Sequence, residues 1–314
     1  MPTITQLEYI IAVEEEKHFG RAAERCHVSQ PSLSTQIQKV EEELDLIIFD
    51  RSRKPIMVTE EGRFIVDQAK STLREHRKIY SLAQGTSVEP RGDFHLAIIP
   101  TLAPYLIPLF LGDFSRKYPD VNLKISELQT ETIVKDLKED RLDAAILVTP
   151  LKDDHIIERH LFYEPFYAFI SEKHRLLEKK QLSHEDLLDQ DLWLLEEGHC
   201  FRDQMLKVCS LKQNRVLSNV EFASGSLETL RKLVKRSCGY TLLPELAVGD
   251  LGKREREKHL RSFKSPVPTR EVSLVHSRSF LKERIITALE ADVMGDLPDN
   301  IRSLKRGDIN VVEI

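Results

Sequence analysis

Two of the chain's four cysteines lie nine residues apart in the stretch GHCFRDQMLKVC, residues 198 to 209. Cys200 directly follows His199 and lies two residues before Arg202, where the pattern predicts that a helix begins. Neighbouring cations and a helix N-terminus both favour a thiolate over a thiol. A thiolate reacts with peroxides to give a sulfenic acid, which condenses with a second thiol to form a disulfide. Cys209 is the candidate for that second thiol.

The spacing of these two cysteines would make oxidation a structural event. A continuous helix from Cys200 to Cys209 would separate their Cα atoms by about 13 Å, at a rise of roughly 1.5 Å per residue. A disulfide needs Cα atoms within about 7 Å of each other. Oxidation would therefore force a conformational change, which is what a redox switch requires.

The other cysteines favour structural roles. Cys26 lies inside a short predicted helix with a small-residue face, which is typical of core packing. Cys238 precedes a glycine that ends a predicted helix, and we interpret it as structural, although it could compete with Cys209 as a resolving partner. A zinc site would need more ligands than His199, Cys200 and Cys209 provide, so we expect no metal and no cofactor.

The composition of the chain limits the classes of protein to which it can belong. The 314 residues, 41% of them hydrophobic and 31% charged, predict a globular protein of two or three domains. The sequence shows no signal pattern and no apolar run long enough for a membrane span, so we expect a cytoplasmic protein that does not associate with membranes. In a reducing compartment any disulfide would be transient and functional. A net charge of −5 does not indicate a nucleic-acid partner, so such a role must come from local geometry.

The first sixty residues predict a helix-turn-helix. Ser29 can cap a helix that begins near Pro31, and its apolar residues recur at intervals of four, three and four (Leu33, Ile37, Val40, Leu44). The opposite face carries short hydrogen-bonding groups and a cation, which suit base edges and phosphates in a major groove. A polar face that is merely solvated would have the same composition. If the face binds DNA, the residues expected to make contacts are Ser29, Gln30, Pro31, Ser32, Thr35, Gln36 and Lys39.

A hairpin and a long helix follow. Residues 47 to 58 predict a hairpin with three cations at its tip, Arg51, Arg53 and Lys54, which could hold phosphates or enter a minor groove. Thr59 can cap the next helix, which runs to about residue 82. A lone helix of this length needs a partner, so we interpret it as a dimerisation helix. Residues 84 to 91 have the composition of a hinge.

Beyond the hinge, predicted strands alternate with helices, which indicates an α/β fold with largely parallel sheets. The length suits two lobes, whose ligands would lie where strands end and helices begin. The final stretch, residues 301 to 314, gives no functional signal. The expected strands cover residues 94–99, 121–125, 144–148, 166–170, 192–195 and 272–275, and the expected helices residues 101–104 onward, 130–137, 183–188, 227–234 and 282–293.

Residues 19 to 62, FGRAAERCHVSQPSLSTQIQKVEEELDLIIFDRSRKPIMVTEEG, resemble the LysR-type transcriptional regulators. The resemblance implies a winged helix-turn-helix domain (residues 1–59), a linker helix and hinge that pair two subunits (60–90), and a two-lobed, periplasmic-binding-protein-like regulatory domain (91–300) followed by a tail (301–314). Lobe I would comprise 91–164 and 267–300, and lobe II 165–266. The predicted DNA-binding domain departs from this family in being locally acidic, since residues 1–60 hold seven Lys and Arg against eleven Asp and Glu. Binding would then depend on a few placed cations, above all Arg51, Arg53 and Lys54.

The similarity extends to the peroxide-sensing members of that family, through LLEEGHCFRDQMLKVC, IPTLAPYLIP, ELQTETI and PVPTREVSLV. It implies that Cys200 is the peroxidatic thiol and Cys209 the resolving thiol. Thr101 and Thr130 would hold the peroxide oxygens, and His199 would orient the peroxide or the thiolate. By the same resemblance Arg270 would stabilise the thiolate and polarise the O–O bond. Asp203 would assist proton transfer to the leaving hydroxide.

The resulting hypothesis is a peroxide-responsive activator of antioxidant genes that is not an enzyme. It would bind double-stranded promoter DNA as a homodimer or homotetramer, with RNA polymerase and a thiol reductant of the glutaredoxin or thioredoxin type as partners. One alternative is a LysR-type regulator that binds a small organic effector in the interlobe cleft, with incidental cysteines. Another is a thiol peroxidase or cysteine hydrolase, although such an enzyme needs neither a wing nor a linker helix.

Overall fold

A computed structural model describes residues 1–84, 89–187, 192–209, 224–277, 282–302, 304 and 309–313. The chain forms two compact units, Met1–Ser87 and Val88–Ile314, each of which is considered by itself. Within the described residues, no helix combines the length and the apolar character needed to cross a membrane.

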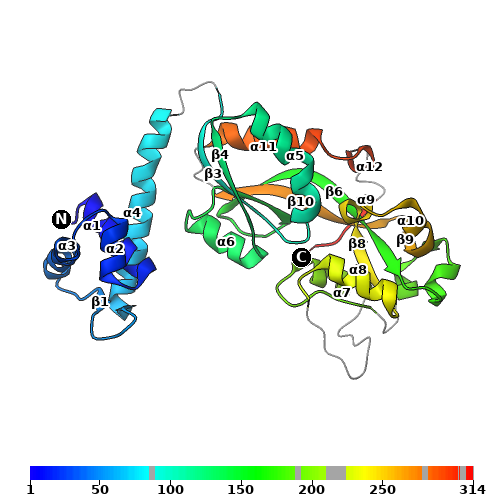
Figure 1. The fold of residues 1–314 in the computed structure, drawn as a ribbon, viewed down its shortest axis with the longest axis horizontal. Coiled ribbons are helices and arrows are strands. Elements are labelled where there is room, and N and C mark those ends of the chain that lie inside the picture. The colour runs from blue at the N-terminus through cyan, green and yellow to red at the C-terminus, as the bar shows by residue number, and fades with distance from the viewer. Residues whose placement is uncertain are drawn as a thin grey trace. The chain divides into compact units, whose positions relative to one another are not determined.

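The first unit is a helix-turn-helix with a wing (Figure 1). Ser29 caps the third helix by accepting a hydrogen bond from the Ser32 amide at 3.3 Å, as predicted. The predicted apolar stripe is buried at Leu33, Ile37 and Val40, but Leu44 is 36% exposed because the helix ends there. The elements are α1 (Ile4–Glu16), α2 (Phe19–Arg25), α3 (Gln30–Leu44), β1 (Phe49–Asp50), β2 (Met57–Val58) and α4 (Glu60–Gln84).

The wing and the long helix are also as predicted. β1 and β2 pair antiparallel, with Phe49 opposite Val58 and Asp50 opposite Met57. The Thr59 hydroxyl oxygen accepts a hydrogen bond from the Gly62 amide at 2.8 Å and so caps the start of α4. α4 packs against α1 along its first turns and continues to Gln84.

The second unit is built on a mixed sheet in the order β4-β3-β5-β10-β6-β9-β7, with β11 beside β10 and β8 beside β6. β3 pairs parallel with β4 and β5, but β10 runs antiparallel to both β5 and β6. The prediction of largely parallel sheets was therefore wrong, because the two long strands β6 and β10 pair antiparallel in the middle of the sheet. The strands are β3 (Gly92–Ile98), β4 (Val121–Glu127), β5 (Ala144–Thr149), β6 (Ile156–Ile170), β7 (Gln181–Leu182), β8 (Tyr240–Pro244), β9 (Leu260–Phe263), β10 (Val267–Ser277) and β11 (Ile309–Val311).

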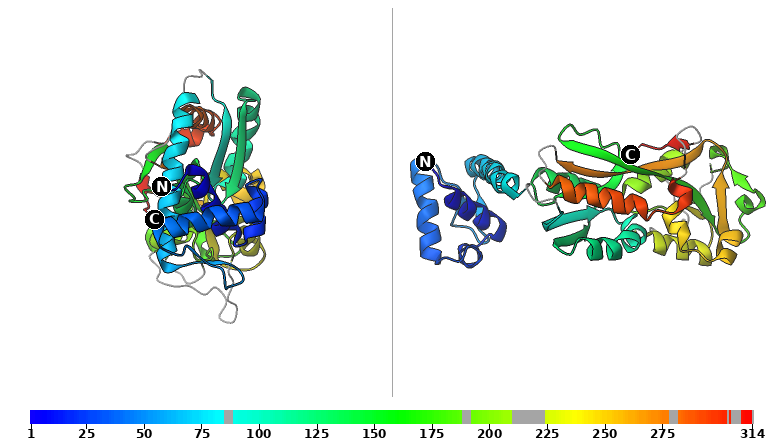
Figure 2. Two further views of the ribbon diagram at one scale, coloured as in Figure 1. Left: turned by 90° about the vertical axis from the view of Figure 1, so that its left-hand side faces the viewer. Right: turned by 90° about the horizontal axis from the view of Figure 1, so that it is seen from above.

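The two long strands, β6 and β10, lie side by side and organise the unit (Figures 1 and 2). β6 pairs with β10 as far as Pro165 and with β8 from Phe166 onward. This change of partner follows Glu164, and β10 begins at Val267. The lobe boundaries near residues 164 and 267 stay a prediction.

Helices cover the sheet and position the site. The segment 192–195 was expected to be a strand, but Leu192 makes only a single bridge to Tyr240, since the chain turns away after Trp193 towards α7. The helices are α5 (Ala103–Lys117), α6 (Thr130–Lys138), α7 (Cys200–Cys209), α8 (Leu227–Arg236), α9 (Glu245–Gly249), α10 (Lys253–His259), α11 (Glu283–Gly295) and α12 (Asp299–Arg302), with 3₁₀ turns η1 (Arg175–Glu178) and η2 (His184–Leu187).

Candidate functional site

The two cysteines of the GHC stretch occupy the two ends of one helix. α7 begins at Cys200 and ends at Cys209, as the sequence predicts. Both thiols are free and buried, with 7% of Cys200 and 0% of Cys209 exposed. Ten residues of α-helix hold their Cα atoms about 13 Å apart. This conformation is therefore incompatible with a disulfide between them.

A turn at Gly198 brings Cys200 against the start of α6. Gly198 has φ +91° and lies so close to Gln129 that an added Cβ would approach its Oε1 to 2.9 Å, so only glycine fits there. The next residue, Thr130, presents its hydroxyl to the Cys200 sulfur, where it favours the thiolate. Among the described residues, its buried oxygen has no hydrogen-bond partner of normal geometry. An unsatisfied hydroxyl beside a thiol is suited to binding a small polar ligand.

Arg270 supplies the buried positive charge of the site. Its side chain is 0% exposed, and its Nη2 lies 2.7 Å from a carboxylate oxygen of Glu164. Its Nη1 donates a hydrogen bond to the Thr101 hydroxyl oxygen at 3.0 Å. The guanidinium also lies 5.2 Å from the ring centroid of Phe201, the residue after Cys200. Strand β10 and the start of α5 thus bring two of the predicted residues together beside the thiol.

Glu164 also belongs to the site, although no motif in the sequence points to it. It is completely buried in β6, and its other carboxylate oxygen accepts a hydrogen bond from the Leu246 amide at 2.8 Å. Burial raises the pKa of Glu164, and the charge of Arg270 opposes that rise. The signal in the sequence was an acidic residue within the apolar run LFYEPFYAFI, because a carboxylate in a buried strand requires a cation or hydrogen-bond donors.

Burial opposes the ionisation of Cys200 that its neighbours in sequence would favour. Burial raises the pKa of the Cys200 thiol, and the opposing effects of Arg270, the Thr130 hydroxyl and the Phe201 amide only reduce that rise. The two basic residues near Cys200 in the sequence contact other groups. Arg202 pairs with Glu197 at 2.9 Å, and His199 Nε2 lies 3.7 Å from a carboxylate oxygen of Glu196. Burial likewise raises the pKa of Cys209, to about 12.

This raised pKa predicts that oxidation of Cys200 becomes faster as pH rises. Since the pKa lies above the ordinary thiol value, the thiolate fraction increases about tenfold per pH unit between pH 6 and 8. The measurement is the rate of sulfenic acid formation in a Cys209→Ser variant, which stops at the first product. A rate that does not change over this range would mean that the thiol is already ionised at neutral pH.

The remaining predicted residues surround the first turn of α7. His199 is 6% exposed, and the glycine at 225 leaves room for its ring, since an added Cβ would approach Nε2 to 3.1 Å. Asp203 is exposed on the first turn of α7, and its charge raises the pKa of Cys200. Its role in proton transfer stays a prediction. Cys238 is exposed after α8, and its carbonyl oxygen accepts a hydrogen bond from the Trp193 indole at 2.7 Å.

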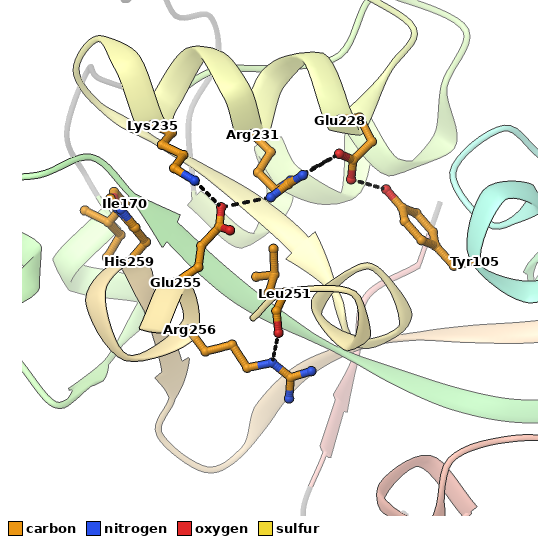
Figure 3. Close-up of polar contacts among 9 residues, drawn as sticks. All are labelled: Tyr105, Ile170, Glu228, Arg231, Lys235, Leu251, Glu255, Arg256 and His259. Atoms are coloured by element: carbon orange, nitrogen blue, oxygen red, sulfur yellow. Dashed lines mark hydrogen bonds and ion pairs between the residues drawn. The ribbon is translucent and has the colours of Figure 1, made fainter. Parts of the chain in front are cut away.

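A polar network joins α8 to α5 and α10 (Figure 3). The Tyr105 hydroxyl on α5 donates to Glu228 of α8 at 3.1 Å, and Arg231 joins Glu228 to Glu255 of α10 at 2.7 and 2.8 Å. Just before α8, the Ser224 carbonyl oxygen accepts a hydrogen bond from the Glu196 amide at 3.0 Å. This bond joins the backbone before the GHC turn to the segment that leads into α8.

A pocket of about 610 Å³ opens next to the thiol site, with Thr130 on its wall. α6 forms one side and residues 150 to 153 form the other, and three lysines lie among its lining residues (Lys135, Lys138, Lys152). Among the described residues, no group of three or more His, Cys, Asp or Glu side chains is placed to hold a metal ion.

The predicted DNA-reading face of α3 is largely open to solvent. Gln36 is half-buried and accepts a hydrogen bond from the Gln6 amide nitrogen at 3.0 Å. The other predicted residues are exposed: Ser29, Gln30, Pro31, Ser32, Thr35 and Lys39. The arrangement provides a continuous polar surface with one cation, which suits a groove lined by base edges and phosphates.

The three wing cations differ in their surroundings. Arg51 is 38% exposed but contacts its own domain, 2.7 Å from Glu41 and 5.1 Å from the ring centroid of Phe19. Arg53 lies 3.2 Å from Asp50 with 66% of its side chain exposed, and Lys54 is exposed. Arg51 therefore has a structural contact that the sequence did not reveal, and its contact with DNA stays a prediction.

We expect an Arg53→Ala and Lys54→Ala double variant to bind all DNA sequences more weakly. Loss of two phosphate contacts should flatten the plot of log affinity against log salt by about 1.8, at roughly 0.9 per contact. Arg51→Ala should instead lower the melting temperature of the domain, because Glu41 loses its cation. Fluorescence anisotropy over a salt series provides the measurement, and an unchanged slope in the double variant would remove the wing from the DNA interface.

Known protein families and relatives match both units of the chain. Residues 4–63 match the model of bacterial regulatory helix-turn-helix proteins of the lysR family, and residues 87–290 match that of the LysR substrate binding domain. The chain is 37% identical to a hydrogen peroxide-inducible genes activator of Haemophilus influenzae, over 87% of this chain and 90% of that protein. It is equally similar, at 37% identity, to the DNA-binding transcriptional dual regulator OxyR of Escherichia coli K12, over 87% and 88% of the two chains.

Solved structures extend the similarity to the fold. A full-length OxyR variant from Pseudomonas aeruginosa superimposes with a TM-score of 0.76 at 36% identity, covering 94% of this chain and 98% of that one. An H2O2-bound OxyR mutant from Corynebacterium glutamicum gives a TM-score of 0.61 at 30% identity over 94% of this chain and 92% of that one. The family models, the relatives and the solved structures agree that this chain belongs to the LysR family of bacterial regulatory helix-turn-helix proteins.

Proposed function

We propose that the chain is a hydrogen-peroxide-sensing transcriptional regulator, switched by a disulfide between Cys200 and Cys209. The observation that carries the proposal is α7 itself, a helix with one buried thiol at each end. The similarity to peroxide-inducible activators over 87% of the chain supports the same function. It favours peroxide over an organic effector as the signal.

The chemistry at Cys200 starts with peroxide between Thr130 and Arg270. The Thr130 hydroxyl, which lies beside the Cys200 sulfur and lacks a partner of normal geometry among the described residues, can bind one oxygen. The Thr101 oxygen already accepts from Arg270, so its own proton can be donated to a peroxide oxygen. The Cys200 sulfur then attacks the near oxygen, the O–O bond breaks and hydroxide leaves, taking up a proton to become water. Arg270 stabilises the developing negative charge, and His199 and Asp203 assist orientation and proton delivery.

The second step is attack by Cys209 on the sulfenic acid. The Cys209 sulfur displaces the sulfenic oxygen, which leaves as a second water, so one peroxide and two thiols give a disulfide and two waters. The thiols begin about 13 Å apart along the helix and must come within disulfide range. α7 must therefore lose helical structure, and the regulatory domain cannot keep its reduced conformation.

The change in the regulatory domain would act on DNA through the linker helix. We infer that α4 pairs two copies of the chain, as a homodimer that assembles further into a homotetramer on double-stranded promoter DNA. RNA polymerase is the partner for activation, and a glutaredoxin- or thioredoxin-type protein returns the disulfide to thiols. We propose that the protein acts in the cytoplasm, together with these partners. One peroxide is consumed per cycle, which makes the protein a sensor, with no role as a turnover enzyme.

A footprint on the DNA upstream of its own gene tests the proposal. The protected region should differ between reduced and peroxide-treated protein, and mass spectrometry of the same samples should show a Cys200–Cys209 crosslink only after treatment. An identical footprint with the crosslink present would separate redox chemistry from regulation. A footprint that responds to a small organic molecule and not to peroxide would support the alternative effector class.

A further inference from the structure

The redox helix α7 is hydrogen-bonded to a segment from the far end of the chain, residues 309–313, here called the latch segment. Gln204, 0% exposed, donates from Nε2 to the Val312 carbonyl oxygen at 2.6 Å. Lys207, almost one turn later, donates from Nζ to the Glu313 carbonyl oxygen at 3.1 Å. Both donors lie between Cys200 and Cys209, in the part of the chain that disulfide formation must rebuild.

The latch segment is anchored to the sheet independently of α7. β11 pairs parallel with the start of β10, and the Val312 amide donates to the Thr269 carbonyl oxygen at 2.8 Å. The carboxylate of Glu313 pairs with Lys152, in the loop after β5, at 2.8 Å. Thr269 immediately precedes Arg270, so the latch segment is attached to the strand that carries the site's buried cation.

Both contacts are made by α7 in its helical form. The Val312 carbonyl oxygen is the described partner of Gln204 Nε2, whereas Gln204 Oε1 is buried without a hydrogen-bond partner among the described residues. A buried amide that loses its partner loses more free energy than an exposed one. Any movement that brings Cys200 and Cys209 within disulfide range displaces residues 204 and 207 from a segment that β10 holds in place.

We propose that the latch segment holds α7 in its helical, reduced conformation and thereby sets how readily the disulfide closes. Gln204 is the positioning residue, because it joins the latch segment to the middle of α7 in the protein interior. The inference rests on the proposed function, since it concerns the second step of the same switch. Disulfide formation releases the latch segment from α7, and reduction restores it.

Two substitutions test the latch. Gln204→Met and Lys207→Met remove the donors but keep residues of similar helix propensity, so α7 itself should be unaffected. We expect sulfenic acid formation at Cys200 to proceed at the wild-type rate in both. Disulfide closure in Gln204→Met should become about fivefold more favourable, the effect of one buried hydrogen bond. This corresponds to a reduction potential more negative by about 20 mV, at roughly 30 mV per tenfold change.

The matched control is Lys232→Met, which removes an exposed lysine from α8 and should leave both steps unchanged. A second measurement is amide hydrogen exchange of residues 310–312 in wild-type protein. The Val312 amide, which donates to Thr269, should be protected in reduced protein. It should exchange faster after oxidation, because the segment then keeps its contacts with the sheet but loses those with α7. Suppose that the Cys200–Cys209 crosslink forms, that the Val312 amide is equally protected before and after oxidation, and that Gln204→Met has the wild-type reduction potential. The latch is then refuted and the proposed function stands. If no crosslink forms, the proposed function itself fails.

Discussion

Cys200→Ser is expected to abolish the peroxide response while leaving DNA binding by the reduced protein intact. The serine hydroxyl keeps the size and the buried position of the thiol but cannot form a sulfenic acid. α7 should therefore remain helical at every peroxide concentration. Reporter expression and promoter footprints, each with and without peroxide, provide the measurement.

Two further cysteine variants act as controls for this result. Cys209→Ser should still consume one peroxide and accumulate sulfenic acid, without any intramolecular crosslink. Cys238→Ser should respond like the wild type, because its exposed thiol lies outside the first and last turns of α7. A full response in Cys200→Ser would place the sensing chemistry elsewhere. Loss of the response in Cys238→Ser would assign the resolving role to Cys238.

Arg270→Met is expected to reduce both stability and the rate of Cys200 oxidation. The substitution leaves Glu164 buried without its cation, and breaking a buried ion pair in this way destabilises a protein by about 3–5 kcal/mol. The pKa of Cys200 should rise further, because Arg270 is the cation that lowers it. Denaturant unfolding and stopped-flow oxidation measure the two effects.

The double variant Glu164→Gln with Arg270→Met separates the two effects. Without the buried carboxylate, most of the stability should return, while oxidation of Cys200 should stay slow. A double variant that oxidises at the wild-type rate would show that Arg270 acts only on stability.

The stability of the single variant Arg270→Met should depend on pH. The pKa of Glu164 is raised in the folded state, so folding favours the protonated carboxyl. The loss of stability should therefore become smaller as the pH falls towards the ordinary pKa of a glutamate.

The local elements of this fold could be read from the sequence. Ser29 and Pro31 indicate where α3 begins. Its apolar stripe identifies the buried face of the helix as far as Val40. The start of α7 at Cys200 could also be predicted, because a turn with glycine precedes it. Such signals depend on residues within a few positions of one another, which is why they hold without knowledge of the rest of the chain.

Contacts between distant segments could not be predicted in this way. The antiparallel pairing of β6 with β10 leaves no local signature, and the expectation of parallel strands failed there. The same is true of the charge that acts on Cys200. His199 and Arg202 are its neighbours in sequence, yet the cation that lowers its pKa is Arg270, which is itself held by Glu164. Only the fold places these residues together.

The structure of the peroxide-treated protein tests the central claim most directly. We predict a disulfide between Cys200 and Cys209, with their Cα atoms brought from about 13 Å to within about 7 Å and with α7 unwound. The claim would be contradicted by an oxidised protein in which α7 remains a continuous helix, or in which Cys200 is bonded to Cys238 instead.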